Sequence, residues 1–482
     1  MLDLRPILLV NGILLALLGL AMLLPAVADL TIDHSDAQVF LAAAAITLFV
    51  GVSFTLTNWG HAGNLNVQQA FILTTSAWVF APAFAALPFV FCELGMDYTD
   101  AFFEAMSGLT TTGSTVVTNL NSAPPGILLW RALLQWLGGI GIIVMAVAVL
   151  PMLQVGGMQL FRLESSEASE KMLPRATQIA GSIAIVYVGF SVLCMLSYWA
   201  AGMSSFDAIA HAMTTIATGG FSTSDQSIGG FNSAAIDATA VFFMVMGSLP
   251  FLLYFQVLQG KPKPLLRDSQ VQWFVATALI LVAIMTVYQL ATGANEGLKA
   301  FRYASFNVIS IMTGTGYATT DYGAWGPFAV MAFFCIMFIG GCAGSTSCGI
   351  KIFRFQVIYS AGWQQIRRMV YPHGVFSPKY NGRTIGTDVI SSVMSFFFLF
   401  FFCYALLAIA LSALGLEPLT ALSAAGSAIA NVGPGLGNMV GPAGTFAPLP
   451  DMAKWLLCLA MLIGRLELFT VLVLFAPSFW RA

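Results

Sequence analysis

Long apolar segments separated by short polar ones dominate the sequence. Ten of them approach the ~20 residues that an α-helix needs to cross the hydrocarbon core of a bilayer. They lie near residues 7–28, 38–57, 70–93, 127–151, 177–200, 236–259, 270–292, 325–350, 388–414 and 452–478. The first also has features of a cleaved signal peptide, but its length favours a retained span. The pattern predicts an all-α membrane protein with ten transmembrane helices.

Four shorter, half-apolar segments lie between these spans. Each has about a dozen residues, too few to cross a bilayer, and they lie near 100–112, 205–217, 300–312 and 418–430. Each ends in a window that opens with a hydroxyl residue and closes with a glycine. The windows are Ser107-Gly108-Leu109-Thr110-Thr111-Thr112-Gly113, Thr214-Thr215-Ile216-Ala217-Thr218-Gly219-Gly220, Ser310-Ile311-Met312-Thr313-Gly314-Thr315-Gly316 and Ser427-Ala428-Ile429-Ala430-Asn431-Val432-Gly433.

The windows recur about every hundred residues, which predicts four pseudo-fourfold repeats of span, pore helix, loop and span. A two-helix N-terminal unit, residues 1–60, would precede pore repeats at 61–160, 161–265, 266–375 and 376–482. Small residues also recur where helices merely pack closely in lipid. That alternative does not explain why they follow a half-length segment each time.

Composition agrees with a membrane protein. Of the residues, 58% are hydrophobic and 8% are charged, whereas soluble domains carry about 25% charged residues. The net charge of −2 gives no electrostatic basis for binding nucleic acid. The seven cysteines lack metal-site spacing, and we interpret them all as buried apolar residues. The histidines, His34, His61, His211 and His373, share no metal-ligand spacing either, and we interpret His211 as a packing residue.

Basic residues are distributed unequally between the two sides of the predicted bundle. With ten crossings and the N-terminus inside, 14 of the 19 lysines and arginines fall on the inner side and 4 on the outer side. The positive-inside rule therefore predicts that both termini are cytoplasmic. It places the four short segments on the outer side. There, Asp100 and Glu104 would either concentrate cations at the mouth of a pore or simply be solvated.

The four windows suit a cation filter. Irregular backbone within a bilayer is tolerated where it is buried in protein or lines water. Converging loops of this kind replace the hydration shell of a cation with rings of carbonyl oxygens. The closing glycine allows the required backbone turn without a Cβ clash, and each short helix directs its negative dipole end toward the ion. No window contains an acidic residue, which favours a weakly hydrated monovalent cation over calcium or an anion.

At these residues the sequence resembles the TrkH and TrkG subunits of bacterial Trk potassium uptake systems, within the Trk/Ktr/HKT superfamily. The resemblance covers essentially the whole chain. Its most specific motifs are Thr110-Thr111-Thr112-Gly113, Ala217-Thr218-Gly219-Gly220-Phe221, Thr313-Gly314-Thr315-Gly316-Tyr317 and Asn431-Val432-Gly433-Pro434-Gly435. The leading helix pair is similar to the pair that distinguishes TrkH from the shorter Ktr-type proteins.

The resemblance implies a filter that binds the transported K⁺. Its residues would be Thr110, Thr111, Thr112, Gly113, Ala217, Thr218, Gly219, Gly220, Thr313, Gly314, Thr315, Gly316, Ala430, Asn431, Val432 and Gly433. In the plant relatives, serine at the first closing-glycine position accompanies sodium transport, so Gly113 favours potassium.

The resemblance also implies partners and a location. It implies a homodimer in the lipid of a bacterial inner membrane, with a cytosolic ring of TrkA-like regulatory subunits that bind nucleotides. We expect no organic cofactor on this chain, because it has no long soluble segment and no glycine-rich strand–loop–helix motif.

The eighth predicted span contains a stretch that is poorly suited to a helix. Residues 340–349 include four glycines and three hydroxyl residues, and glycine costs about 1 kcal/mol per helical position relative to alanine. We expect the helix to break there, just below the filter. The family has an obstructing intramembrane loop at this place, which we interpret as a movable gate; the alternative is a rigid, close-packed kink. Its candidate residues are Gly340, Gly341, Gly344, Ser345, Thr346 and Gly349.

Arg465 lies within the last predicted span. A charge at that depth costs several kcal/mol and normally faces a cavity or a partner. Glu467, two residues on, points to a different helix face and is not an obvious partner. The family carries an arginine here that faces the pore beneath the filter. We therefore interpret Arg465 as an electrostatic barrier that acts with the loop; the alternative is an ion pair with another helix.

Three functions compete on the sequence alone. The preferred one is a gated, channel-like potassium uptake subunit. A K⁺ symporter coupled to H⁺ or Na⁺ usually has inverted repeats and an ionisable midplane site. The predicted repeats instead share one orientation, and we expect only Arg465 and Glu467 to be charged deep in the spans. A membrane enzyme needs a nucleophile–base pair or a metal cluster. We find no convincing set, so we expect no enzyme.

Overall fold

The computed structural model describes residues 3–60, 65–145 and 172–481. Within these ranges the fold is almost entirely helical; the one strand pair, β1 (Lys379–Tyr380) and β2 (Arg383–Thr384), is antiparallel. The last part of the predicted span 127–151, the unit boundaries after residues 60 and 160, and His61 lie outside the described residues.

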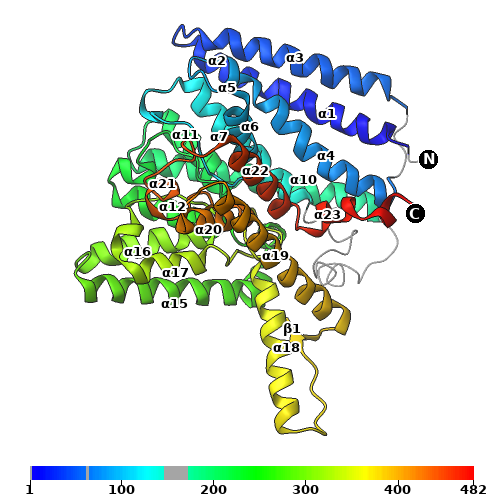
Figure 1. The fold of residues 1–482 in the computed structure, drawn as a ribbon, viewed down its shortest axis with the longest axis vertical. Helices are drawn as coiled ribbons and strands as arrows, with labels where there is room; N and C mark the ends of the chain where they lie inside the picture. Colours follow the sequence, from blue (N-terminus) through cyan, green and yellow to red (C-terminus); the bar gives the residue numbers. More distant parts are fainter. Residues whose placement is uncertain (1–2, 61–64, 146–171, 482) are drawn as a thin grey trace.

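The N-terminal helices form one edge of the molecule (Figure 1). The helices α1 (Arg5–Ala21) and α2 (Leu23–Leu30) together make one apolar span that packs along α3 (Asp36–Thr57). Glycine permits the close approach, since a Cβ at Gly12 would lie 2.8 Å from the carbonyl oxygen of Gly51. Such contacts between small residues drive helix association in lipid, where apolar burial supplies no driving force.

Each of the four half-apolar segments forms a helix of 12 to 16 residues. These pore helices are α6 (Tyr98–Leu109), α11 (Ser205–Ile216), α16 (Gly297–Met312) and α20 (Pro418–Ala430). The first two begin at side-chain caps, because Asp97 and Ser204 each accept a hydrogen bond from the backbone N–H three residues on.

Other helices, some longer and some shorter, precede and follow the pore helices along the chain. The helices around α6 are α4 (Val67–Ala85), α5 (Leu87–Phe91) and α7 (Pro125–Val144), and those around α11 are α10 (Met172–Ala200), α12 (Ala234–Gly247) and α13 (Phe251–Leu258). The helices around α16 are α15 (Ser269–Thr292) and α17 (Pro327–Ile336). The helices around α20 are α19 (Thr387–Ala413), α22 (Asp451–Arg465) and α23 (Phe469–Leu472). The shorter helices α14 (Lys263–Arg267) and α21 (Gly437–Val440) lie in connections, and α18 (Ile352–Val370) projects from the body beside the β1–β2 hairpin (Figure 1).

Three of the ten predicted spans are not single continuous helices. Within the described residues, seven helices are long and apolar enough to cross a membrane, or up to nine if each sharply bent pair is one span. The bends measure 95° between α12 and α13, and 109° between α22 and the segment Phe469–Phe475. In the predicted span 325–350, α17 ends at Ile336 and the glycine-rich stretch that follows is not helical.

Two of these breaks satisfy each other's backbone groups. The backbone groups that the α12–α13 break leaves free are taken up by the non-helical stretch, since Cys342 N–H donates to Ser248 O at 3.0 Å and Phe251 N–H donates to Gly344 O at 3.0 Å. Pro250 also removes one donor at this break. Irregular backbone is therefore paired with irregular backbone inside the protein, as burial requires.

The two described chain ends meet at the first turn of α4. The Gln69 side chain donates to the carbonyl oxygen of Asp3 at 2.8 Å, and the Gln68 side chain donates to that of Phe479 at 2.6 Å. Both ends of the described chain thus lie on the same side of the helix bundle.

Candidate functional site

One turn geometry ends all four pore helices. In each, the backbone N–H of the residue before the closing glycine donates to the carbonyl of the opening hydroxyl residue, at 2.9–3.0 Å. The residue two positions before each closing glycine takes a left-handed conformation, as in a Schellman helix end. These residues are Thr111 (φ 50°), Thr218 (φ 49°), Gly314 (φ 73°) and Asn431 (φ 52°). β-Branched residues rarely adopt this conformation, so the surrounding contacts must hold Thr111 and Thr218 in place.

The closing glycines join the four loops into a ring. A Cβ on each closing glycine would collide with a carbonyl oxygen of the next loop in chain order. In every case that oxygen belongs to the residue just before the closing glycine of that next loop. The contacts are Gly113 with Gly219 O, Gly220 with Thr315 O, Gly316 with Val432 O, and Gly433 with Thr112 O. The fourth contact returns to the first loop, so the ring closes. All four glycines have positive φ, between 78° and 111°.

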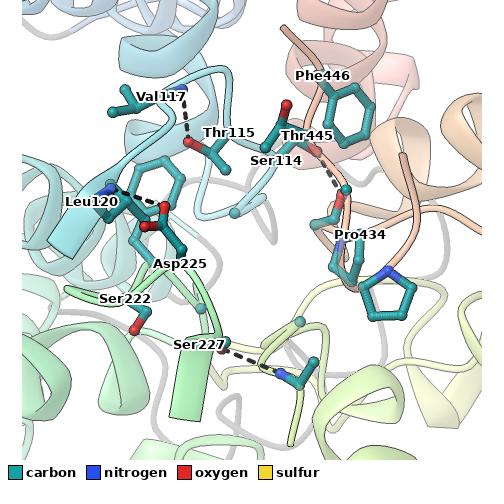
Figure 2. A pocket seen from close by; sticks show the side chains of 18 of the residues that line it. Ser114, Thr115, Val117, Leu120, Ser222, Asp225, Ser227, Pro434, Thr445 and Phe446 are labelled. Carbon is teal, nitrogen blue, oxygen red and sulfur yellow. Dashed lines mark hydrogen bonds between the residues drawn. The ribbon is translucent and has the colours of Figure 1, made fainter. Parts of the chain in front are cut away.

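A cavity of about 290 Å³ opens on one side of this ring (Figure 2). All four closing glycines line it, together with polar groups of the segments that follow them, which include Ser114, Thr115, Ser222, Ser227 and Asp225. Hydrogen bonds order these segments. Ser114 Oγ donates to Gly433 O at 2.7 Å, and Leu120 N–H donates to the Asp225 carboxylate at 2.8 Å. The cavity is therefore a polar vestibule with the loop ring at its base.

Buried side chains brace the ring from behind. The Gln135 amide donates to Gly219 O at 2.7 Å and accepts from Phe221 N–H at 3.0 Å, so it fixes both sides of the second closing glycine. Asn431 donates to Thr112 Oγ1 at 2.9 Å and links the fourth loop to the first. Gln135 was not predicted from the sequence. A lone amide within the apolar span 127–151 was the available signal.

The non-helical stretch lies directly against the other side of the ring and contacts all four loops. Thr346 Oγ1 donates to Ile216 O at 3.0 Å, Ser347 Oγ donates to Thr313 O at 2.7 Å, and Gly349 N–H donates to Ala430 O at 2.8 Å. Cys348 Sγ lies 3.5 Å from Thr111 Oγ1. The predicted break below the loops is confirmed, and Ser347 and Cys348, which were not among the predicted residues of this stretch, also contact the loops.

The remaining predicted gate glycines shape this stretch. Gly344 and Gly349 have φ values of 73° and 74°. Gly340 N–H donates to Ile350 O at 2.9 Å, and Gly341 N–H donates to Ser347 Oγ at 2.9 Å. Ser345 Oγ donates to Cys342 O at 2.6 Å, within the stretch itself. The loop is thus folded on itself and closely packed.

Arg465 reaches the same loop. Its Nη1 donates to Cys348 Sγ at 2.7 Å and to Thr346 O at 3.3 Å. Its Nε and Nη2 atoms have no hydrogen-bond partner, and no carboxylate pairs with it among residues 3–60, 65–145 and 172–481. The ion-pair alternative finds no partner in that part of the chain.

Buried charges near this loop are more numerous than the sequence indicated. Glu467 forms an ion pair with Arg354, and both side chains are buried. Lys351 is also buried and donates to Ser347 O. The expectation that only Arg465 and Glu467 are charged at this depth is therefore corrected, because Lys351, directly before α18, and Arg354, within α18, are buried as well.

The two outer carboxylates also have different roles from those predicted. Glu104 is fully buried and pairs with Arg131 at 2.7 Å, while it accepts from Val116 N–H at 2.9 Å. Arg131 donates in turn to Ser222 O at 2.8 Å, so the pair ties the first loop segment to the second. Asp100 forms an ion pair with Lys454. Neither carboxylate is a freely solvated loop group.

The cysteine and histidine predictions are partly confirmed. His211 is buried and packs as predicted, with its ring nitrogens 2.9 Å from Asp207 O and Ser222 Oγ. Four cysteines besides Cys348 are buried, but Cys335 is exposed and Cys403 is half-buried. Cys348 also differs from the prediction, because it contacts Arg465 and does not serve only as apolar packing.

Comparison with known proteins places this arrangement in a family. The profile of the TrkH family, described as a cation transport protein, matches residues 36–482. The chain is 45% identical to the Trk system potassium uptake protein TrkI of Halomonas elongata, over 99% of this chain and 97% of that protein. The chain belongs to the TrkH family.

Further relatives agree with this assignment. The Trk system potassium uptake protein TrkH of Salmonella typhimurium is 38% identical, and the match covers 99% of each chain. The crystal structure of the potassium transporter TrkH from Vibrio parahaemolyticus superposes with a TM-score of 0.92 at 34% identity and covers 100% of both chains. These relatives are transporters, and the TrkH-family chain described here is a multi-pass membrane protein.

Proposed function

We propose that this TrkH-family chain is the potassium-selective, ion-translocating subunit of a Trk-type uptake system. In this proposal, K⁺ passes through the ring of four loops, and the sixteen predicted filter residues bind it. The closed cycle of glycine-to-carbonyl contacts carries the proposal. It brings equivalent carbonyls of all four loops around one axis, and carbonyl rings can replace the hydration shell of a cation.

Charge supports a monovalent cation as the transported ion. The four loop windows contain no acidic residue, and the nearby Glu104 is neutralised by Arg131. Each pore helix also ends at its loop, so its negative dipole end faces the ring. The attraction is therefore spread over dipoles, which suits a weakly hydrated ion such as K⁺ better than Ca²⁺.

The gate in this proposal is the stretch 340–349 together with Arg465. Contacts of this stretch with all four loops support an obstructing position, and the free N–H groups of Arg465 support a positive barrier at the same level. A K⁺ symporter coupled to H⁺ or Na⁺ is the alternative, and the buried carboxylate of Glu467 is the observation that favours it. That carboxylate is already paired with Arg354.

The proposal extends to partners and location. We infer a homodimer in the lipid of a bacterial inner membrane, with both termini cytoplasmic, regulated by a TrkA-like nucleotide-binding ring. The names of the relatives, which refer to Trk systems, support a multi-component assembly. The division into a two-helix unit and four pore repeats remains part of the same proposal.

The test is ion flux into proteoliposomes that contain this chain alone, compared with Gly113→Ser. Serine at this position would be strained at φ 88° and would displace the Gly219 carbonyl. We expect potassium-selective flux in the wild type and a relaxed K⁺ over Na⁺ preference in the variant. Gly293→Ser is the matched control, since Gly293 also has positive φ but a Cβ there would meet no other atom within 4 Å.

The outcomes separate the candidates. Equal selectivity of Gly113→Ser and Gly293→Ser would contradict the filter. Uphill K⁺ flux driven by an imposed H⁺ or Na⁺ gradient would support the symporter over the channel-like mechanism. Flux that appears only after Arg465→Ala would support a pore that is held shut in the absence of its partner.

A further inference from the structure

A cluster of three potential metal ligands lies outside the loop ring and its cavity. His34 and Asp36 come from the turn between α2 and α3, and Glu93 comes from the connection between α5 and α6. One ligand atom from each residue lies within 4.8 Å of the other two. Chain positions almost sixty residues apart are thus brought together, which no spacing in the sequence indicates.

The two segments are fixed in place by hydrogen bonds around the cluster. Ser35 Oγ donates to Glu93 Oε1 at 2.7 Å, and Glu93 N–H donates to Asp36 Oδ1 at 3.2 Å. His34 N–H donates to Asp29 O at 3.0 Å. The backbone that carries the three ligands is therefore already positioned, and only side-chain rotation is needed to close them around an ion.

One carboxylate oxygen of the cluster has no donor. The Asp36 side chain is 2% exposed, and its Oδ2 has no hydrogen-bond partner in the described chain. This oxygen lies 3.9 Å from His34 Nδ1, which is too long for a hydrogen bond. His34 Nδ1 accepts a hydrogen bond from Asp36 N–H at 3.3 Å, so Nε2 is the ring nitrogen that is left to bind an ion. Buried polar atoms are normally satisfied, so an anionic oxygen without a donor beside an imidazole is suited to a cation.

The separations also suit a bound ion. His34 Nε2 and Glu93 Oε2 lie 3.7 Å apart. Two ligands bound to one tetrahedral zinc ion at about 2.0–2.1 Å are about 3.4 Å apart. Glu93 is 63% exposed, so its side chain is free to move by the small distance required.

We propose that His34, Asp36 and Glu93 form a binding site for one divalent transition-metal ion of the zinc class. An imidazole nitrogen with two carboxylates favours such an ion, whereas calcium and magnesium prefer all-oxygen ligands. The ion would join the α2–α3 turn to the α5–α6 connection, and so fasten the N-terminal helix pair to the segment that leads into pore helix α6. The inference does not depend on the proposed ion filter.

The test is calorimetric titration of ZnCl₂ into the full chain, purified in detergent without a polyhistidine tag. We expect saturable binding of one zinc per chain in the wild type. His34→Ala and Glu93→Gln, both at partly exposed positions, should weaken it at least about tenfold, the effect that even changes to groups behind the ligands have on metal sites. His373→Ala is the matched control, because it removes an exposed histidine elsewhere and should bind zinc like the wild type.

Hydrogen exchange locates the effect. Zinc should slow amide exchange in the α2–α3 turn and the α5–α6 connection of the wild type, and not in His34→Ala. Equal zinc affinity of His34→Ala and the wild type, or no saturable binding by a wild type that elutes as a folded species, would overturn the proposal. Protection confined to other segments would do so as well.

Discussion

At the scale of residues, each loop window divides its tasks between two positions. The opening hydroxyl residue supplies the carbonyl that accepts the helix-ending hydrogen bond, and the closing glycine allows contact with the carbonyl of the next loop. Glycine is needed at the second position because a Cβ would occupy the place of that carbonyl. The closing glycine therefore reflects a steric requirement, whereas the hydrogen bond at the opening position uses a backbone carbonyl that any residue would supply.

Arg465 offers a prediction at the same scale. If its unpaired guanidinium opposes cations beneath the ring, Arg465→Ala should raise basal K⁺ flux into proteoliposomes about tenfold or more, which corresponds to lowering the barrier by about 1.4 kcal/mol. Arg465→Lys keeps the charge and serves as the control, with flux near that of the wild type. Unchanged flux in a folded Arg465→Ala protein would remove the barrier role.

At the scale of elements, the breaks in three predicted spans serve one arrangement. The α12–α13 break, the end of α17 and the bend after α22 all face the stretch 340–349 or the residues packed against it. The α12–α13 break exchanges backbone hydrogen bonds with this stretch, whereas the backbone groups at the bend after α22 bond within their own segment and the Arg465 side chain makes the link. Such a loop can move to an alternative position only if its hydrogen bonds to the pore helices are weak enough to break and be replaced by others.

Thr346→Val tests this directly. The Thr346 hydroxyl lies 3.0 Å from Ile216 O and 2.9 Å from Gly247 O, and its single proton is shared between these two carbonyls. One such hydrogen bond contributes about 0.5–1.5 kcal/mol. Valine keeps the shape but loses this shared bond, so single-channel open probability should rise.

The matched control for that measurement is Ser345→Ala. Its hydroxyl bonds only to Cys342 O within the stretch, so the open probability should stay near that of the wild type. If Ser345→Ala and Thr346→Val behave alike, the anchoring contacts between the loop and the pore helices do not control the gate.

At the scale of the whole molecule, orientation is the property that remains to be tested. The two described chain ends meet at α4, and the distribution of basic residues predicts that this side is cytoplasmic. Val375, in the connection after α18, is 96% exposed, whereas Leu298, in the first turn of α16, is 86% exposed.

Single cysteines at these two positions should report the orientation. In a Cys335→Ala background, a membrane-impermeant maleimide should label Leu298→Cys in intact cells and Val375→Cys only in inside-out vesicles. Native Cys92 should stay silent, because burial raises the pKa of its thiol to about 11 and thiolate is the reactive form. The reverse labelling pattern would place the termini outside.

Several features followed from the sequence by itself. Apolar length identified the bilayer as the solvent, and the short pore helices and the break near residue 340 were predicted correctly, because each depends on the local content of apolar residues and glycine. The closing glycines were recognised for the same reason, since a positive φ is a property of one residue and its neighbours.

Only the tertiary structure decided which distant groups meet. Glu104 is neutralised by Arg131, Gln135 braces the second loop, and Cys348 contacts Arg465. Likewise, Glu93 lies beside His34 only because two separate connections pack together. The sequence gives the type of a polar residue, but not whether its side chain is paired, supports a neighbouring segment or has no partner. The role of such a side chain depends on partners that folding brings within about 3 Å. The local sequence pattern does not identify these partners.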